Sequence, residues 1–202
     1  YMNPLNRDYS KTLELEVAGV PHVFAWGGLH GAIPKYHGEG WFVNVDVASY
    51  YPSLMLVYKW LSRNVHDPSK YAEIYHNRLK LKAEKNPLQQ PYKIVLNSTY
   101  GAMKDKHNAM YDPRQANNVC VGGQLLLLDL IERLEDHCEI IQSNTDGILV
   151  KLRRYEDFEM LDDLCWEWEQ RTGMRLEFDE FQKVYQKDVN NYLWVGIDGG
   201  VE

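Results

Sequence analysis

Two aspartates that lie one hundred residues apart have the setting of a divalent metal site. Asp46 lies at the end of the apolar run 41–47, and Asp146 lies at the tip of the apolar segment 140–150. In both places a carboxylate can face solvent while its strand-type backbone stays rigid. Divalent cations such as Mg²⁺ prefer hard oxygen ligands. The two carboxylates, if the fold brings them together, therefore predict a metal-ion site.

A basic segment with helical periodicity lies between the two aspartates. Residues 93–101 read Lys-Ile-Val-Leu-Asn-Ser-Thr-Tyr-Gly, and Lys93, Asn97, Tyr100 and Lys104 share one face of a predicted helix. A face of this kind suits an anionic phosphate group. Carboxylates that bind metal ions, combined with a helix that binds phosphate, predict nucleotidyl transfer. The alternative for the lysines is an ordinary solvated helix face.

Three segments resemble the motifs of the family B DNA polymerases, in the order and spacing of that family. The segment 46–53, Asp-Val-Ala-Ser-Tyr-Tyr-Pro-Ser, resembles motif A, an aspartate and two variable residues followed by Ser-Leu-Tyr-Pro-Ser. The segment 93–101 matches every fixed position of motif B, Lys-x-x-x-Asn-Ser-x-Tyr-Gly. Asn-Thr-Asp at 144–146 takes the place of Asp-Thr-Asp in motif C, and the glycine-rich segment 27–34 resembles the turn before motif A. The resemblance extends over about residues 25–195, and its details are similar to the compact polymerases of bacteriophages or mobile elements.

The resemblance implies an α+β fold in which an antiparallel-sheet polymerase palm packs on helices and carries an inserted helical-hairpin fingers subdomain. It implies that residues 1–58 form the first part of the palm with motif A, and that residues 59–106 form the fingers with motif B. Residues 107–202 then form the second part of the palm, with motif C and the strands that contact primer and template. The exonuclease and thumb domains of the family cannot fit in 202 residues. We therefore expect a palm-and-fingers fragment, which can be inactive when it is isolated.

The resemblance also implies a two-metal mechanism. Asp46 and Asp146 would be ligands shared by two Mg²⁺ ions, for which Mn²⁺ can substitute, and the backbone carbonyl of Val47 would be a further ligand. Lys93 would act with the two aspartates by neutralising charge on the triphosphate, since phosphoryl transfer depends mainly on positioning and charge neutralisation.

The remaining implied contacts divide between the incoming nucleotide and DNA. Arg78, Lys82 and Lys93 would hold the triphosphate, and the rigid ring of Tyr51 would lie under the sugar and exclude a 2′-hydroxyl. The full set of expected nucleotide contacts comprises the backbone amides of Ser49 and Tyr50 and the side chains of Tyr51, Arg78, Lys82, Lys93, Asn97 and Tyr100. Contacts with DNA are expected from Gly101, Asn144, Thr145, Lys183, Lys187 and Tyr192.

Each of these roles has a structural alternative, and one residue departs from the family pattern. Asp46 and Asp146 also suit a strand end and a hairpin turn, the tyrosines suit core packing, and residues 183–192 suit an amphipathic edge strand. Asn144 replaces the first aspartate of motif C, so the site has one negative charge fewer. An amide oxygen can still bind a metal ion, and we expect lower metal affinity with activity retained.

The composition is that of an ordered globular protein with an uneven charge distribution. The net charge is −7, yet residues 59–106 hold ten Lys/Arg against four Asp/Glu, and residues 155–180 hold ten acidic residues. This charge distribution suits a basic region that binds anions next to an acidic region that binds metal ions. The alternative is two solvated faces of opposite charge. No apolar run is long enough for a membrane helix and no secretory signal opens the chain. The three cysteines lack metal spacing, and we expect them to be reduced core residues of a cytoplasmic protein in a bacterial or phage-infected cell.

Hydrophobic periodicity predicts alternating hairpins and helices, which favours an antiparallel α+β domain. The glycines of segment 27–40 predict tight turns and a hairpin that delivers Asp46, and Pro52 predicts the start of a helical turn. The apolar stretch 125–131 predicts a helix packed beneath a sheet. The predicted strands are 12–17, 41–47, 138–142, 147–153, 174–178, 181–186 and 192–197, and the predicted helices are 52–58, 69–85, 90–104, 114–137 and 156–171.

Three functions compete at this point. The first is the catalytic core of a template-directed DNA polymerase, whose partners are primer–template DNA and deoxynucleoside triphosphates. The second is a catalytically weak polymerase remnant that binds DNA or a replication partner. The third is an RNA-binding α+β module, which lacks support because its aromatic sheet-surface signature is absent.

Overall fold

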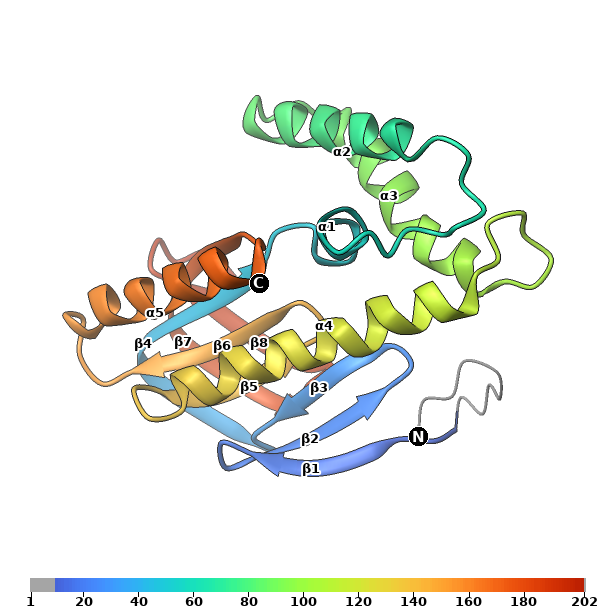
Figure 1. Cartoon of the computed structure of the whole chain (residues 1–202). Coiled ribbons are helices and arrows are strands. Elements are labelled where there is room, and N and C mark those ends of the chain that lie inside the picture. The colour runs from blue at the N-terminus through green and yellow to red at the C-terminus, as the bar shows by residue number, and fades with distance from the viewer. Residues whose placement is uncertain (1–9, 202) are drawn as a thin grey trace. The chain divides into compact units, whose positions relative to one another are not determined.

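The computed structural model describes residues 10–201, and within them the chain has an α+β fold of eight strands and five helices (Figure 1). Residues 1–9 and 202, which belong to the first and last predicted palm segments, lie outside the described residues. The strands are β1 (Leu13–Val17), β2 (Val20–Ala25), β3 (Gly28–Ala32), β4 (Tyr36–Val47), β5 (Glu139–Asn144), β6 (Gly147–Leu152), β7 (Leu176–Asp188) and β8 (Asn191–Gly196). The helices are α1 (Tyr50–Val57), α2 (Pro68–Ala83), α3 (Gln89–Lys104), α4 (Pro113–Leu134) and α5 (Asp157–Thr172).

All eight strands form one antiparallel sheet in the order β1-β2-β3-β5-β6-β4-β7-β8. The antiparallel α+β prediction is therefore confirmed. The described residues divide into two compact units, one comprising 10–48 and 121–201 and the other comprising 49–120. We call the first the sheet unit and the second the helical unit.

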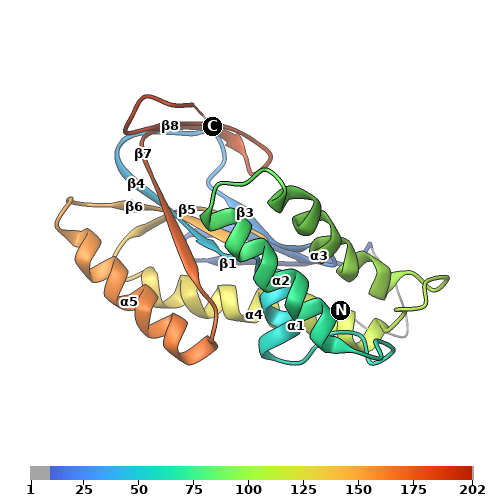
Figure 2. The same ribbon diagram turned by 90° about the horizontal axis from the view of Figure 1, so that it is seen from above.

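In the sheet unit, helix α5 and residues 121–134 of α4 lie across one face of the sheet (Figures 1 and 2). Alternate residues of the central strands are fully buried on this side, for example Val43, Val45 and Ile148. The Trp168 indole of α5 is also fully buried, and its Nε1–H donates to the Leu126 carbonyl of α4 over 3.2 Å. Because side chains alternate along a strand, the residues between the buried ones face the opposite side of the sheet.

The central strand β4 contains a bulge. Glu39 pairs with Lys183 of β7, but Phe42 pairs with Phe181, so β4 has one residue more than β7 in this interval. Gly40 lies in the bulge with φ 138°, a conformation that residues with a Cβ rarely adopt. Beyond the bulge, Phe42 joins the apolar cluster on the side away from the helices, and Asp46 follows on that same side.

Helices α2 and α3 of the helical unit are stabilised by a helix cap and by contacts with each other. Asp67 caps α2 by accepting a hydrogen bond from the Ser69 amide over 3.0 Å, and Pro68 occupies the first turn. Leu96, Thr99 and Met103 form a buried stripe along α3, and the Tyr71 hydroxyl of α2 donates to the Leu96 carbonyl over 3.0 Å. These contacts explain why both helices form close to their predicted limits.

Several predicted elements differ from the structure. The predicted strands 174–178 and 181–186 are one strand, β7, because Asp179 and Glu180 stay in the ladder with β4 while their side chains line open pockets. The predicted hairpin that delivers Asp46 is wrong, since the glycine-rich turn joins β2 to β3 and β4 pairs with β6 and β7 instead. The predicted strand 138–142 extends to Asn144 as β5, so the turn before β6 contains only Thr145 and Asp146.

Two predictions from composition can be compared with the described residues. The three cysteines, Cys120, Cys138 and Cys165, are free and buried, as expected. Burial raises the pKa of the Cys138 and Cys165 thiols to about 12, which keeps them protonated and unreactive. Among residues 10–201, no helix is long and apolar enough to cross a membrane.

Candidate functional site

Four neighbouring strands of the sheet unit bring polar residues into two adjacent rows. In the first row, Asp46 of β4 pairs with Gly147 of β6 and with Glu177 of β7, and Gly147 also pairs with Asn144 of β5. The second row lies two residues further along each strand, so its side chains face the same side of the sheet. Its members are Gln142, Leu149, Asn44 and Asp179.

Asp46 and Asp146 line the same pocket, which has a volume of about 220 Å³ and which we call the carboxylate pocket. The amide of Val47 donates to the carbonyl of Asp146 over 2.6 Å, and this bond ties the end of β4 to the turn between β5 and β6. The pocket is lined by Asn44, Asp46, Gln142, Asn144, Asp146, Gly147, Leu149, Asp179, Tyr192 and Trp194. The fold therefore brings the two predicted aspartates together, although their role as metal ligands stays a prediction.

The turn that carries Asp146 is held against the β2–β3 turn by Thr145. The Thr145 hydroxyl lies 3.2 Å from His30 Nε2 and 3.5 Å from the Gly27 carbonyl oxygen. A Cβ atom at Gly28, which has φ 137°, would lie 2.6 Å from the same hydroxyl oxygen. The glycine-rich turn thus allows the turn that carries Asp146 to approach closely. The Thr145 hydroxyl forms hydrogen bonds within the chain, and its contact with DNA stays a prediction.

The surroundings of His30 favour its neutral form. Burial lowers the pKa of His30, and the nearby Asp146 carboxylate offsets only part of that effect. A neutral imidazole can exchange a hydrogen bond with the Thr145 hydroxyl as either donor or acceptor. His30 therefore supports the turn without adding a fixed positive charge beside Asp146.

The donor atoms around the carboxylate pocket suit Mg²⁺. Within residues 10–201, no group of three or more His, Cys, Asp or Glu side chains is arranged to hold a metal ion by itself. Mg²⁺, however, usually keeps several water ligands and is bound by one or two carboxylates together with substrate phosphates. Asp46 and Asp146 supply the two carboxylates, and Asn44 and Asn144 line the pocket with amide groups.

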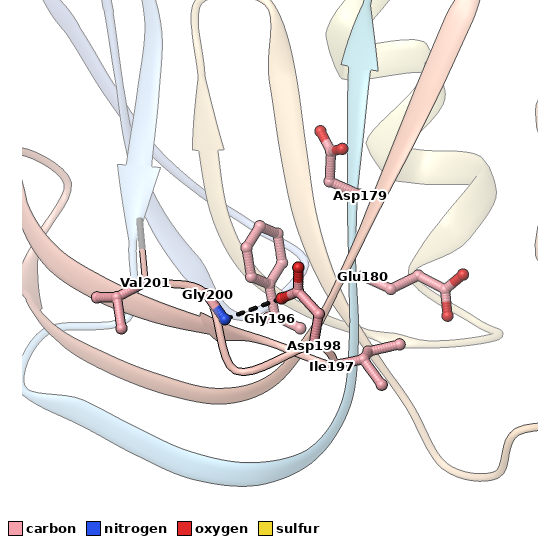
Figure 3. A pocket seen from close by; sticks show the side chains of 8 residues that line it. Asp179, Glu180, Gly196, Ile197, Asp198, Gly200 and Val201 are labelled. Atoms are coloured by element: carbon pink, nitrogen blue, oxygen red, sulfur yellow. Dashed lines mark hydrogen bonds between the residues drawn. The ribbon is translucent and has the colours of Figure 1, made fainter.

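A second, more open pocket lies beside the carboxylate pocket, along β7 and the end of β8. Its volume is about 620 Å³, and Figure 3 shows Asp179, Glu180 and Asp198 among its lining residues. Asp198 accepts a hydrogen bond from the Gly200 amide over 2.9 Å and so holds the turn that follows β8 (Figure 3). Asp179 lines both pockets and therefore lies at the boundary between them.

In the helical unit, Arg78 is buried and hydrogen-bonds to the hydroxyl of Ser49. Ser49 precedes α1 and has a left-handed backbone conformation, with φ 51°. The predicted phosphate-binding arginine therefore contacts the residue whose amide is predicted to bind phosphate. The expected nucleotide contact of Tyr50 involves its backbone amide, and its side chain is buried.

The two predicted nucleotide-contacting tyrosines pack against each other in the helical unit. The rings of Tyr51 and Tyr100 meet edge to face, with centroids 4.7 Å apart. Burial, with smaller effects from Cys120 and Tyr100, raises the pKa of Tyr51 well above its usual value. The Tyr51 phenol is thus neutral and its ring packs against Tyr100, while its role in sugar selection stays a prediction.

The other predicted residues of the helical unit are exposed on α2 and α3. Lys82, Lys93, Asn97 and Gly101 are all solvent-exposed, so each can meet a ligand from solution. The shared face of α3 is not wholly polar, since Tyr100 is buried and the Lys104 ammonium lies 4.3 Å from the centre of its ring.

The predicted DNA-contacting residues near the C-terminus have different surroundings. Lys183 forms an ion pair with Glu39 over 2.9 Å, whereas Lys187 is solvent-exposed. Tyr192 stacks on Trp194, with ring centroids 4.4 Å apart and an interplanar angle of 23°. Tyr192 lines the carboxylate pocket together with Asp46 and Asp146.

Six residues that line the pocket were not among the site residues predicted from the sequence: Asn44, Gln142, Gly147, Leu149, Asp179 and Trp194. Asn44 and Gln142 lie two positions before Asp46 and Asn144, so strand alternation places them on the same face as these two predicted residues. That signal is available in the sequence. Asp179 and Trp194 come from β7 and β8, and only the pairing of those strands brings them to the pocket.

Comparison with known proteins finds a similarity over part of the chain. No protein-family model matches this chain. The chain is similar to DNA polymerase II of Escherichia coli (strain K12), with 30% identity over 97 residues, which is 46% of this chain and 12% of that protein. The similarity supports a DNA polymerase-related origin for this region and agrees with the resemblance to family B. The chain corresponds to only a small part of the length of that relative.

Proposed function

We propose that this chain is the catalytic core of a template-directed DNA polymerase of the family B type. It adds deoxynucleotides to the 3′ end of a primer by two-metal-ion nucleotidyl transfer. The observation that carries this proposal is that Asp46 and Asp146, one hundred residues apart, line one pocket. The three motifs and the partial similarity to DNA polymerase II support it. The bacteriophage or mobile-element subtype is proposed from motif details alone.

In this proposal the sheet unit is the palm and the helical unit provides the fingers. Asp46, Asp146 and the Val47 carbonyl hold two Mg²⁺ ions, which stabilise the attacking 3′ oxygen and the leaving pyrophosphate when they are bound. Lys93, Lys82 and the buried Arg78 neutralise charge on the triphosphate, and Asn97 supports them. Cations that are fixed before the substrate arrives stabilise charge without costly reorganisation.

Metal binding tests the site directly. Mn²⁺ binding to the chain, followed by electron paramagnetic resonance, is expected to weaken strongly in Asp46→Asn and in Asp146→Asn. Asp162→Asn removes an exposed carboxylate on α5 and serves as the matched control, with unchanged Mn²⁺ affinity. Equal Mn²⁺ binding in all three variants and in the parent chain would show that the pocket is not a metal site.

A second candidate, the catalytically weak remnant, is favoured by Asn144, which leaves motif C with one carboxylate. Extension of a labelled primer–template separates the two functions. Phosphate contacts supply much of nucleic-acid affinity, so the assay uses low salt and excess protein. Extension that Asp146→Ala abolishes identifies the polymerase, whereas DNA binding without extension, combined with Mn²⁺ binding that does not depend on Asp46 and Asp146, identifies the remnant.

A further inference from the structure

Helix α5 packs on the sheet with one side and exposes the other side to solvent (Figure 1). Its buried residues recur at helical spacing, at Leu161, Cys165, Trp168 and Thr172. Four exposed residues lie on the opposite side of the helix, and we call them the outer stripe: Glu159, Asp162, Asp163 and Trp166. The outer stripe thus combines one large aromatic ring with three carboxylates.

Trp166 is the aromatic member of the outer stripe. All six tryptophans of the chain lie within residues 10–201, and Trp166 alone among them is exposed, at 59%. Burial of a large aromatic ring is favourable, whereas Trp166 leaves most of its indole in water. Tryptophan is also among the residues that contribute most to binding at protein interfaces. The exposed indole therefore marks a surface that another molecule can cover.

The carboxylates of the outer stripe differ from Asp157 at the start of the same helix. Asp157 forms an ion pair with Arg154 over 3.2 Å. Within residues 10–201, by contrast, Glu159, Asp162 and Asp163 form no ion pair. Glu159 precedes the two aspartates by three and four residues, a spacing at which like charges repel each other on a helix surface. The outer stripe therefore carries negative charge that the described part of the chain does not neutralise.

An arginine side chain has the chemistry that fits both the ring and the carboxylates. Its planar guanidinium can stack on an indole and can also donate two hydrogen bonds to a carboxylate. Trp166 follows Asp162 by four residues and Asp163 by three, a spacing that separates Cβ atoms by about 5–6 Å. One guanidinium on the indole can therefore reach either carboxylate. A lysine ammonium lacks the planar fork and can make only part of these contacts.

The position and the charge of the outer stripe argue against nucleic acid as its occupant. The stripe belongs to a helix that covers one side of the sheet, whereas Asp46 lies on the side away from the helices. The phosphates of DNA and the headgroups of anionic lipids are negatively charged, so three carboxylates repel them. A protein segment that contains several arginines is attracted instead.

We propose that the outer stripe of α5 is a docking surface for an arginine-rich segment of another protein. One arginine of this segment stacks on Trp166 and pairs with Asp162 or Asp163, and a neighbouring arginine pairs with Glu159. This interaction goes beyond the proposed polymerase function and does not depend on it.

A fluorescein-labelled hexa-arginine peptide tests the surface by fluorescence anisotropy at low salt. Trp166→Ala leaves the net charge unchanged and should weaken binding of this peptide by about fivefold. Tyr185→Ala removes an exposed ring from β7 and is the matched control, with unchanged affinity. A hexalysine peptide should bind the parent chain more weakly than hexa-arginine does, and Trp166→Ala should reduce that difference.

The role of charge is tested by two double variants that each remove two carboxylates. Asp162→Asn combined with Asp163→Asn should weaken binding of hexa-arginine by about tenfold. Glu14→Gln combined with Glu16→Gln, at exposed positions of β1, should weaken it by about twofold at most, which is the effect of net charge alone. The α5 double variant should unfold at an equal or higher urea concentration than the parent chain, because it removes like-charge repulsion. Its loss of binding then does not result from unfolding.

The outcomes identify the occupant. Equal losses in the two double variants, or unchanged affinity in Trp166→Ala, would show that net charge alone holds the peptide and would overturn the proposal. Sedimentation of the chain by itself at low salt tests a second copy as the occupant, since residues 59–106 hold ten Lys/Arg. Self-association that Trp166→Ala abolishes would also overturn the proposal. Mn²⁺ binding should be equal in Trp166→Ala and in the parent chain, so failure of this inference leaves the proposed function unaffected.

Discussion

Gly147 lies directly opposite Asp46, and a Cβ atom at Gly147 would lie 2.9 Å from Asp46 Oδ1. Real Cβ atoms essentially never come this close to a neighbouring atom, so a side chain here must displace the carboxylate. Gly147 therefore does more than allow the tight turn between β5 and β6. Its missing side chain leaves space for the Asp46 carboxylate to point toward the pocket.

Gly147→Ala is expected to weaken Mn²⁺ binding by about 10- to 100-fold, the range found when the support of a metal ligand is disturbed. Gly27→Ala is the control, because a Cβ atom there meets nothing within 4 Å. Electron paramagnetic resonance titration measures both variants. Unchanged Mn²⁺ affinity in Gly147→Ala would show that the space beside Gly147 is not needed for metal binding.

Asn144→Asp is expected to raise Mn²⁺ affinity by about tenfold and to raise the rate of primer extension, since an additional carboxylate in the pocket increases the attraction for cations. The Asn144 Oδ1 atom accepts a hydrogen bond from the Thr145 amide over 2.8 Å, and a carboxylate oxygen can accept the same bond. The turn should therefore keep its shape. Asn108→Asp, which adds the same charge outside the pocket, should change neither quantity. A variant in which neither affinity nor rate rises would refute the account of Asn144 as a weakened metal ligand.

Gly101→Ala separates stability from DNA contact. Gly101 lies inside α3, is exposed, and a Cβ atom there meets nothing within 4 Å. Alanine should therefore raise the free energy of unfolding by about 0.5–1 kcal/mol. If DNA approaches this position closely, the same methyl group should lower the affinity for primer–template, measured by fluorescence anisotropy at low salt. Ser98→Ala on the same helix is the control, and higher stability with unchanged DNA affinity would remove Gly101 from the DNA-contacting residues.

The ion pair between Arg63 and Asp112 predicts acid sensitivity of the helical unit. Asp112 is 3% exposed and accepts two hydrogen bonds of 2.8 Å from the Arg63 guanidinium and one of 3.0 Å from its amide. Hydrogen bonds from Arg63 hold the pKa of Asp112 below its ordinary value. The pair therefore stabilises the fold above the ordinary carboxyl pKa of about 4 and loses this effect as the pH falls through the lowered pKa.

Asp112→Asn should lower the free energy of unfolding at pH 7 by about 1–3 kcal/mol. The difference from the parent chain should shrink as the pH falls below 4, as measured by urea unfolding at several pH values. Glu73→Gln breaks the exposed contact with Lys70, at 3.8 Å, and should have little effect at any pH. A pH-independent effect of Asp112→Asn would contradict the ionic origin of the stabilisation.

The local parts of the fold could be predicted from the sequence because their signals are local. Helices α2 and α3 end within a few residues of their predicted limits, since a proline, a capping aspartate and a periodic apolar stripe define them. The strands were harder to delimit. Asp179 and Glu180 have the composition of a turn, but pairing with β4 keeps them extended, and that pairing depends on residues far away in the chain.

In the candidate site, too, some residues could be predicted from the sequence and others are brought in only by long-range pairing. Asp46 and Asp146 could be identified from their motifs, whereas Asp179 and Trp194 enter the pocket only through strand order. Gln142 has no motif of its own, and only the folded chain shows that its buried Oε1 atom accepts no hydrogen bond within residues 10–201. Residues that contact a ligand through tertiary pairing have no required spacing along the chain, so their periodicity cannot reveal them.

The bulge at Gly40 allows β4 to hold one residue more than β7 without changing the side of the sheet on which the Asp46 carboxylate lies. Glu39 and Phe42 pair with Lys183 and Phe181, which are two residues apart on β7 and therefore face the same side of the sheet. The extra residue is accommodated in the bulge, so the register from Phe42 to Asp46 is the one that a regular ladder would give. Evolution can therefore lose or keep this residue without moving Asp46, whereas a single insertion or deletion between Phe42 and Asp46 would need a new bulge to keep the carboxylate on the pocket side.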